Sequence, residues 1–133
     1  MRVGLVRLVS FLACLGIAVT ALAQFGHPLK GTWSGDWGTS KDRRNHVLLE
    51  LNWDGKAITG TINPGPDALP LRKASLDPAH WTVHFEADGK DRSGNTVHYV
   101  IDGKLENLGA PYRSITGTWS HGTVKGDFKI TRN

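Results

Sequence analysis

Cysteine is almost missing from this chain. Its 133 residues include one cysteine, Cys14, which lies in an apolar stretch near the N-terminus. If export removes this stretch, the remaining chain has no thiol. We therefore expect no disulfide and no cysteine nucleophile. The fold must then be stabilised by a hydrophobic core, which a domain of about 110 residues can supply.

Long apolar runs are also missing beyond the N-terminus. Residues 1–7 carry two arginines, residues 8–22 are almost entirely apolar, and Ala21-Leu22-Ala23 places small residues where signal peptidase cuts. This pattern predicts a secretory signal peptide over residues 1–23. The alternative is a membrane anchor, but an apolar run of about 15 residues is short for a bilayer span. We expect an exported protein, periplasmic or extracellular, with no stable membrane anchor after cleavage.

A strong charge of one sign is missing as well. Without Arg2 and Arg7, the chain keeps 14 basic residues against 12 acidic ones, a net charge of +2. The basic residues are scattered along the chain and do not form one cluster. A nucleic-acid-binding surface needs a concentrated basic patch, so no nucleic-acid partner is predicted.

Helical periodicity is missing, and alternation with a period of two takes its place. Residues 24–30 form a short polar lead, and residues 31–133 form one domain of alternating segments separated by turn residues. In the last segment, Val124, Phe128 and Ile130 are expected to point inward. We expect strands over residues 31–37, 46–53, 57–62, 69–76, 81–87, 96–102, 115–120 and 123–132. The predicted fold is all-β, a single antiparallel up-and-down barrel of about eight strands.

Two short motifs carry a family resemblance. Gly31-x-Trp33 begins the first expected strand, and Arg132 ends the last one on the inward face. Together with the strand count, they resemble the calycin superfamily of lipocalins, fatty-acid-binding proteins and avidins. The lipocalin resemblance implies that Trp33 packs across the base of the barrel beneath Arg132. From the residues alone, an inward-pointing charge needs a partner, and an aromatic face is one.

The chain departs from two of these calycin groups. It has no helix pattern after the last strand, unlike lipocalins, and no recognisable avidin set of biotin ligands, so biotin is not implied. Its repeated Gly-x-Trp motifs also resemble small secreted bacterial β-domains of unassigned function. That second resemblance implies no activity.

The expected loops distinguish the two ends of the barrel. In an antiparallel meander, connections alternate between ends, and the long ones over residues 38–45, 63–68 and 88–95 fall at one end, which we take as the mouth. Strand direction then assigns three tryptophans to the base: Trp33, Trp53 and Trp81. The residues expected to bind a ligand at the mouth are Trp37, Trp119, Tyr99 and Phe85. A barrel filled by side chains is the alternative, because eight strands leave room for one small ligand at most.

The preferred function is non-catalytic binding of a small, partly apolar ligand, lipophilic or aromatic. One alternative is a structural or interaction module with a filled barrel and a protein or surface partner. Another is a carbohydrate-binding module that uses exposed tryptophans. The sequence contains no Gly-x-Ser-x-Gly elbow and no His-Glu-x-x-His motif. No catalytic residue and no cofactor are therefore predicted.

His84 and His98 are a candidate metal-ligating pair. We expect them side by side across the hairpin of the fifth and sixth strands, with Glu86 two residues beyond His84. Two histidines and a carboxylate can bind zinc. All three residues lie on the polar face opposite the aromatic one, where solvated side chains need no ligand. The preferred interpretation is therefore that no metal is bound.

Overall fold

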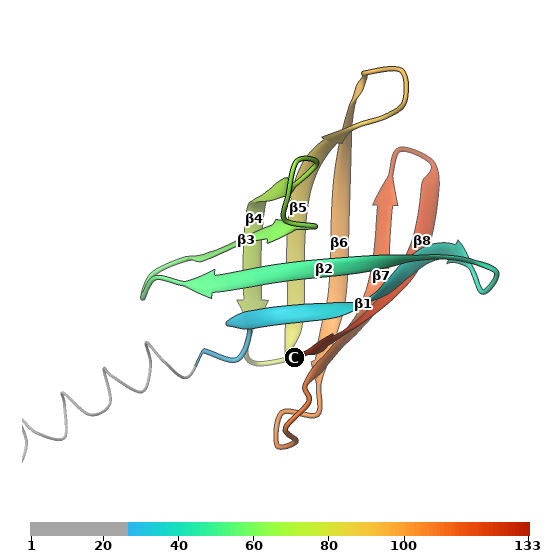
Figure 1. Cartoon of the computed structure of the whole chain (residues 1–133). Coiled ribbons are helices and arrows are strands. Elements are labelled where there is room, and N and C mark those ends of the chain that lie inside the picture. The colour runs from blue at the N-terminus through green and yellow to red at the C-terminus, as the bar shows by residue number, and fades with distance from the viewer. Residues whose placement is uncertain (1–26) are drawn as a thin grey trace, which may run out of the picture.

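The computed structural model describes residues 27–133, which form a β-barrel (Figure 1). Its strands are β1 (Gly31–Ser40), β2 (Arg43–Trp53), β3 (Ile58–Ile62), β4 (Leu69–Asp77), β5 (Thr82–Lys90), β6 (Thr96–Glu106), β7 (Ser114–His121) and β8 (Val124–Arg132). The predicted signal peptide over residues 1–23 lies outside the described residues. Within the described part, no helix has the length and hydropathy needed to cross a membrane.

The strands form one closed antiparallel ring. Each strand pairs with the next along the chain, and β8 pairs with β1 to complete the barrel. Closure gives both end strands a partner, which is how barrels avoid the exposed edges that invite aggregation. The predicted fold class, a single up-and-down barrel of eight strands, is confirmed.

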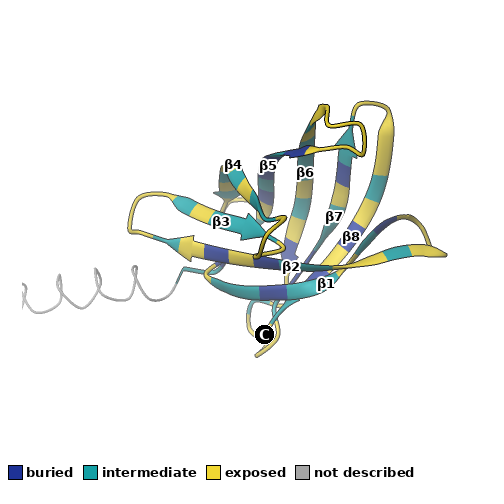
Figure 2. Cartoon of the chain, turned by 45° about the horizontal axis from the view of Figure 1, so that its top comes forward, coloured by how far each residue is buried: buried dark blue, intermediate teal, exposed yellow. Residues whose placement is uncertain are grey.

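Alternation along the strands explains why this sequence forms a barrel. In β5, Val83, Phe85 and Ala87 are buried, whereas the residues between them are half-buried. Successive side chains of a strand point to opposite faces, so one face of β5 fills the interior and the other meets solvent. Figure 2 shows a related change between half-buried and exposed bands along β4, where no residue is fully buried.

The predicted boundaries of the first hairpin are wrong. β1 and β2 both extend into the predicted loop over residues 38–45, so only two residues connect them. The added strand residues are polar, and ion pairs stabilise them: Arg44 of β2 bonds Asp36 of β1 and Asp127 of β8. The longest connection between the strands instead lies at the base, over residues 107–113.

β3 and β4 share the shortest stretch of pairing in the barrel. Only Thr61↔Pro70 and Ile62↔Leu69 are in register between them, against nine pairs between β5 and β6. Proline has no N–H to donate, so Pro70 cannot support a regular ladder. The barrel is therefore least tightly joined at this seam.

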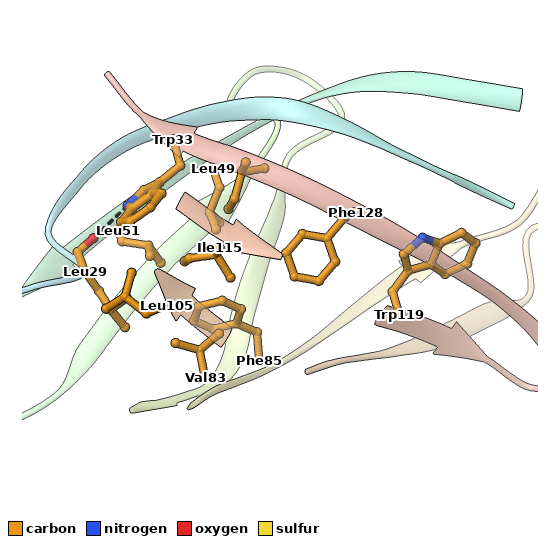
Figure 3. Packing of buried hydrophobic residues seen from close by; sticks show 11 residues of the cluster. Leu29, Trp33, Leu49, Leu51, Val83, Phe85, Leu105, Ile115, Trp119 and Phe128 are labelled. Carbon is orange, nitrogen blue, oxygen red and sulfur yellow. Dashed lines mark hydrogen bonds between the residues drawn. The ribbon is translucent and has the colours of Figure 1, made fainter. Parts of the chain in front are cut away.

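The base of the barrel is filled by side chains around Trp33. Trp33 is fully buried, and its Nε1 donates a 2.8 Å hydrogen bond to the Leu29 carbonyl. Leu29 is itself fully buried, although it belongs to the lead that the sequence predicts to be polar. Figure 3 shows both residues at one end of the core and Trp119 at the other, with Ile115 and Phe128 between them. The lead therefore seals the base.

Val124 is not buried in the core. It is 39% exposed, whereas Phe128 and Ile130 farther along β8 are buried as predicted. Val124 adjoins the tight turn between β7 and β8 and pairs with His121 at the very end of the ladder. It therefore lies beyond the packed interior and, unlike Phe128 and Ile130, is not part of the core.

Candidate functional site

The half of the barrel away from Trp33 contains a cavity. The cavity measures about 120 Å³ and is partly open to solvent. Thirteen residues line it: five aromatic residues, seven aliphatic residues and one amide, Asn63. None of these lining residues is a lysine, arginine, histidine, aspartate or glutamate. A cavity with such a wall favours apolar ligands.

The residues predicted to bind a ligand all lie on this wall: Trp37, Phe85, Tyr99 and Trp119. They come from β1, β5, β6 and β7, so four strands bring together residues that are distant in sequence. Phe128 of β8 completes the aromatic set and pairs directly with Trp37. Binding by these residues stays a prediction, but the barrel does gather them around one space.

Trp119 is the centre of the aromatic group. Its ring centroid lies 4.9 Å from that of Trp37, with the planes at 78°, and 6.4 Å from that of Tyr99, with the planes at 55°. The His121 ring stacks on Trp119 at 5.9 Å, with the planes at 16°. Rings set edge to face attract one another through their quadrupoles. The Trp37 and Tyr99 rings are therefore set at large angles to the Trp119 ring, and all three line the cavity.

Trp119 is held in one orientation by β8. Its Nε1 donates a 3.1 Å hydrogen bond to the Asp127 carbonyl, and its ring lies against Gly126, its register partner. A Cβ atom at position 126 would come within 2.5 Å of the Trp119 ring. Glycine at this position therefore makes room for the indole.

Asn63 is the polar residue of the cavity wall and directly follows β3. Its backbone has a φ of 50°, in the left-handed region that asparagine adopts more readily than most residues. Its Oδ1 accepts a 3.0 Å hydrogen bond from the Leu48 N–H, and its own N–H donates to the Leu48 carbonyl at 2.7 Å. These two bonds fix Asn63 against β2. The sequence predicts a loop over residues 63–68 but does not identify Asn63 as a wall residue.

The two residues predicted to close the base are direct partners. Trp33 of β1 and Arg132 of β8 face each other in register. The aliphatic part of the Arg132 side chain passes over Gly31, where a Cβ atom would lie 3.1 Å from Arg132 Cδ. Arg132 Nη1 donates a 3.5 Å hydrogen bond to the Lys30 carbonyl. The contacts of Arg132 thus include the lead as well as the first strand.

Arg113 is a base residue that sequence reasoning missed. It lies in the connection between β6 and β7, and its Nη1 donates a 3.0 Å hydrogen bond to the Pro28 carbonyl. Burial and, to a smaller extent, repulsion from Arg132 lower the pKa of Arg113. The sequence places Arg113 in an irregular stretch, and no local pattern reveals that this stretch folds against the lead.

Acidic residues and histidines alternate on the outer face of β5 and β6. We call Asp88, His98, Glu86, His84 and Asp102 the charge string. His98 lies 2.6 Å from Asp88 through Nδ1 and 2.8 Å from Glu86 through Nε2. His84 lies 2.8 Å from Glu86 through Nε2 and 2.6 Å from Asp102 through Nδ1. Every ring nitrogen of the two histidines therefore faces a carboxylate.

The prediction that His84 and His98 lie side by side is wrong. The strand register puts His84 opposite Asp102 and His98 opposite Asp88, so Glu86 separates the two rings. The ring nitrogens of His84 and His98, which would have to bind a metal, are instead hydrogen-bonded to carboxylates. Among residues 27–133, no group of three His, Cys, Asp or Glu side chains is arranged to hold a metal ion.

Hydrogen bonds within the charge string favour the charged forms of His84, His98 and Glu86. Bonds to Asp102 and then Glu86 raise the pKa of His84, and bonds to Asp88 and then Glu86 raise the pKa of His98. Bonds to His84 and then His98 lower the pKa of Glu86. An ionised carboxylate can only accept hydrogen bonds, so a histidine that donates from both nitrogens must be protonated.

Comparisons of this chain with protein-family models, with curated proteins and with solved structures found no match. A fold alone does not define an activity. Function is therefore inferred from the geometry of the cavity and its surroundings.

Proposed function

We propose that this protein is exported and binds a small, partly apolar ligand in the barrel cavity without catalysing a reaction. The observation that carries the proposal is the partly open cavity of about 120 Å³, walled almost entirely by apolar side chains. Sites for small molecules are typically concave and apolar with a few placed polar groups. Asn63 and the indole of Trp37 are such groups on this wall.

A relationship to the calycins is part of the same proposal. It is supported by the Gly31-x-Trp33 motif, by the eight-stranded meander, and by the pairing of Trp33 with Arg132. The buried position of Trp33 in the base also supports it, because a filled base leaves ligand binding to the opposite half. Export is inferred from the signal-peptide pattern of residues 1–23.

The test is a titration of the purified protein with toluene, followed by two-dimensional NMR of the tryptophan indole N–H groups. We expect saturable shifts of Trp37 and Trp119, which line the cavity, and no shift of Trp53, which stacks on His27 with ring centroids 4.5 Å apart. Toluene is a suitable probe because it is close in size to the benzene molecule that a cavity of about 150 Å³ admits.

A second variant separates the cavity from the rest of the surface. Val47 lies on the wall, and Val47→Phe adds a ring to the space. We expect this variant to keep the barrel fold, measured by circular dichroism, and to lose the toluene-induced shifts. If wild-type protein shows no saturable shift, the binding function is wrong, and a protein or surface partner becomes the leading alternative.

A further inference from the structure

The size of the cavity limits the ligand to about one ring. An engineered protein cavity of about 150 Å³ admits benzene, and the present cavity measures about 120 Å³. Because it is partly open, a substituent on the ring can extend toward solvent. A compound of about six to nine non-hydrogen atoms fits this space, whereas a long-chain lipid does not.

The chemistry of the wall favours an uncharged ligand. The thirteen lining residues include no side chain that is ionised at neutral pH. The nearby charges of Asp36, Arg44 and Asp127 are bonded to one another on the outer face of β1, β2 and β8. A charged group that entered the cavity would lose its hydration without gaining an opposite charge, which is unfavourable.

The shape of the wall favours an aromatic ring. Trp37 and Trp119 meet edge to face at 4.9 Å, and Tyr99 is tilted against Trp119. Phe85 and Phe128 contribute two more rings to the same wall. An aromatic ring can make stacked and edge-to-face contacts with these wall rings. A saturated ring has no π system, so it lacks the quadrupole interactions that stabilise such contacts.

Three side chains of the wall keep a hydrogen-bond donor that bonds no acceptor among the described residues: Trp37, Tyr99 and Asn63. The indole N–H of Trp119 already donates to the Asp127 carbonyl. Among the described residues, Trp37 Nε1 donates to no protein acceptor, yet it is not sealed from solvent. A neutral acceptor on the ligand would therefore gain a partner on this wall, with no charge to desolvate. Of the three donors, the Trp37 indole is the one that belongs to the edge-to-face pair with Trp119.

From these four observations we infer that the cavity binds an uncharged, single-ring aromatic compound that accepts a hydrogen bond from the Trp37 indole. The inference rests on the proposed binding function and narrows it to one class of ligand.

The first experiment measures the affinities of matched probes for wild-type protein by calorimetry. Benzamide, benzoate and benzamidinium have the same shape and differ in charge. We expect benzamide to bind at least about tenfold more tightly than either ion, because an ion must be desolvated. Cyclohexanecarboxamide keeps the amide but has no aromatic ring, and we expect it to bind about threefold or more weakly than benzamide.

The second experiment tests the hydrogen bond with Trp37→Phe, which keeps a ring but removes the N–H. We expect this variant to weaken benzamide binding about fivefold more than it weakens toluene binding, because only benzamide can accept the lost hydrogen bond. Trp53→Phe is the matched control, because Trp53 lies outside the wall, and it should change neither affinity. Circular dichroism of both variants verifies the fold.

The outcomes distinguish this inference from the proposed function. An ion or cyclohexanecarboxamide that binds as tightly as benzamide overturns the ligand class, while toluene binding still supports the cavity as a site. Equal losses of benzamide and toluene affinity in Trp37→Phe overturn the role of the indole N–H. Failure of every probe, toluene included, overturns the proposed function itself.

Discussion

Trp33 and Trp119 are the same residue type in different surroundings. Trp33 is fully buried at the base and bonds the Leu29 carbonyl, while Trp119 is also largely buried but has one side on the cavity. The difference arises from what fills the barrel at each level. Leu29 and Leu51 pack into the base, whereas no comparable side chain fills the space beside Trp119.

Truncation of Trp33 should destabilise the protein strongly. We expect Trp33→Ala to lower the free energy of unfolding by about 3–5 kcal/mol, because it leaves a void and an unpaired Leu29 carbonyl. Urea unfolding measures the change. Tyr112→Ala is the control, since Tyr112 is 67% exposed and should change stability by less than about 0.5 kcal/mol. A near-neutral Trp33→Ala would show that Trp33 does not anchor the base.

The sequence identifies residues best where they follow the strand alternation. Phe85 and Tyr99 could be placed on the inner face because apolar and polar positions alternate around them. Leu29, Asn63 and Arg113 could not, because each lies outside a strand and its position depends on how a loop or lead crosses the barrel. Periodicity contains no information about such segments.

At the level of elements, β5 and β6 carry a charge arrangement with a defined dependence on pH. Lys73 and Arg72 of β4 extend the charge string by pairing with Glu86 and Asp88. The string joins β4, β5 and β6 on the outer face of the barrel. Its contribution to stability should therefore follow the protonation of its histidines and carboxylates.

The pKa shifts fix the direction of this dependence. The folded pKa values of His84 and His98 lie above the ordinary 6.5, so their contribution is complete below pH 6.5 and is lost as pH rises through the raised values. The folded pKa of Glu86 lies below the ordinary 4.5, so its contribution is present above pH 4.5 and is lost as pH falls through the lowered value. The string stabilises the fold most between pH 4.5 and 6.5.

Glu86→Gln should therefore lower the melting temperature most between pH 4.5 and 6.5. The difference from wild type should narrow as pH rises through the raised pKa values of His84 and His98, where the histidines lose their charge. A melting-temperature difference that is constant with pH would contradict the pairing of Glu86 with charged His84 and His98.

The individual histidines can be followed by NMR titration. His84 and His98 should have midpoints above 6.5, and His27 should have one below 6.5 because burial lowers its pKa.

The element count is predictable, but the strand ends are not. Eight alternating segments correspond to the eight strands, because burial of one face imposes a period of two. The first hairpin is longer than predicted because Arg44 pairs with carboxylates on two neighbouring strands. Such ion pairs depend on the barrel being closed, so a single segment of sequence does not reveal them.

At the scale of the whole molecule, the β1–β8 pairing closes the barrel. The two strands share six register pairs, and the backbones come very close at Gly35, where a Cβ atom would lie 1.9 Å from the Lys129 carbonyl oxygen. Contact this close excludes any side chain at position 35. Gly35 is therefore a requirement of closure.

Gly35→Ala should open or distort the pairing of β1 with β8. We expect a loss of about 3 kcal/mol or more in the free energy of unfolding, because the methyl group must displace a strand backbone. Gly109→Ala is the matched control, since a methyl group at this position of the 107–113 connection would meet no other part of the chain within 4 Å. Denaturant unfolding of the two variants measures the contrast, and equal stabilities would contradict the close approach of β1 and β8.

The division of the barrel into a filled base and a hollow mouth could not be decided from sequence. Bulky inward residues favour a filled barrel, and the strand count permits one small ligand. Whether the barrel is filled or hollow at a given level depends on how far the side chains at that level extend into the interior. Trp33 and Leu29 meet across the base, whereas Trp37 and Trp119 pack against each other on the wall.

Barrel closure also has a consequence for the time course of folding. Ser34 of β1 donates a hydrogen bond to Asn133 across 99 residues, and the whole β1–β8 ladder joins segments of similar separation. A chain that emerges with its N-terminal part first has β1 available long before β8 has been synthesised. Contacts of such high sequence separation form slowly, because the loop must close before the pairing stabilises it. Until then, one edge of β1 is unpaired and open to other chains, so assembly of this barrel is most vulnerable just before its last strand arrives.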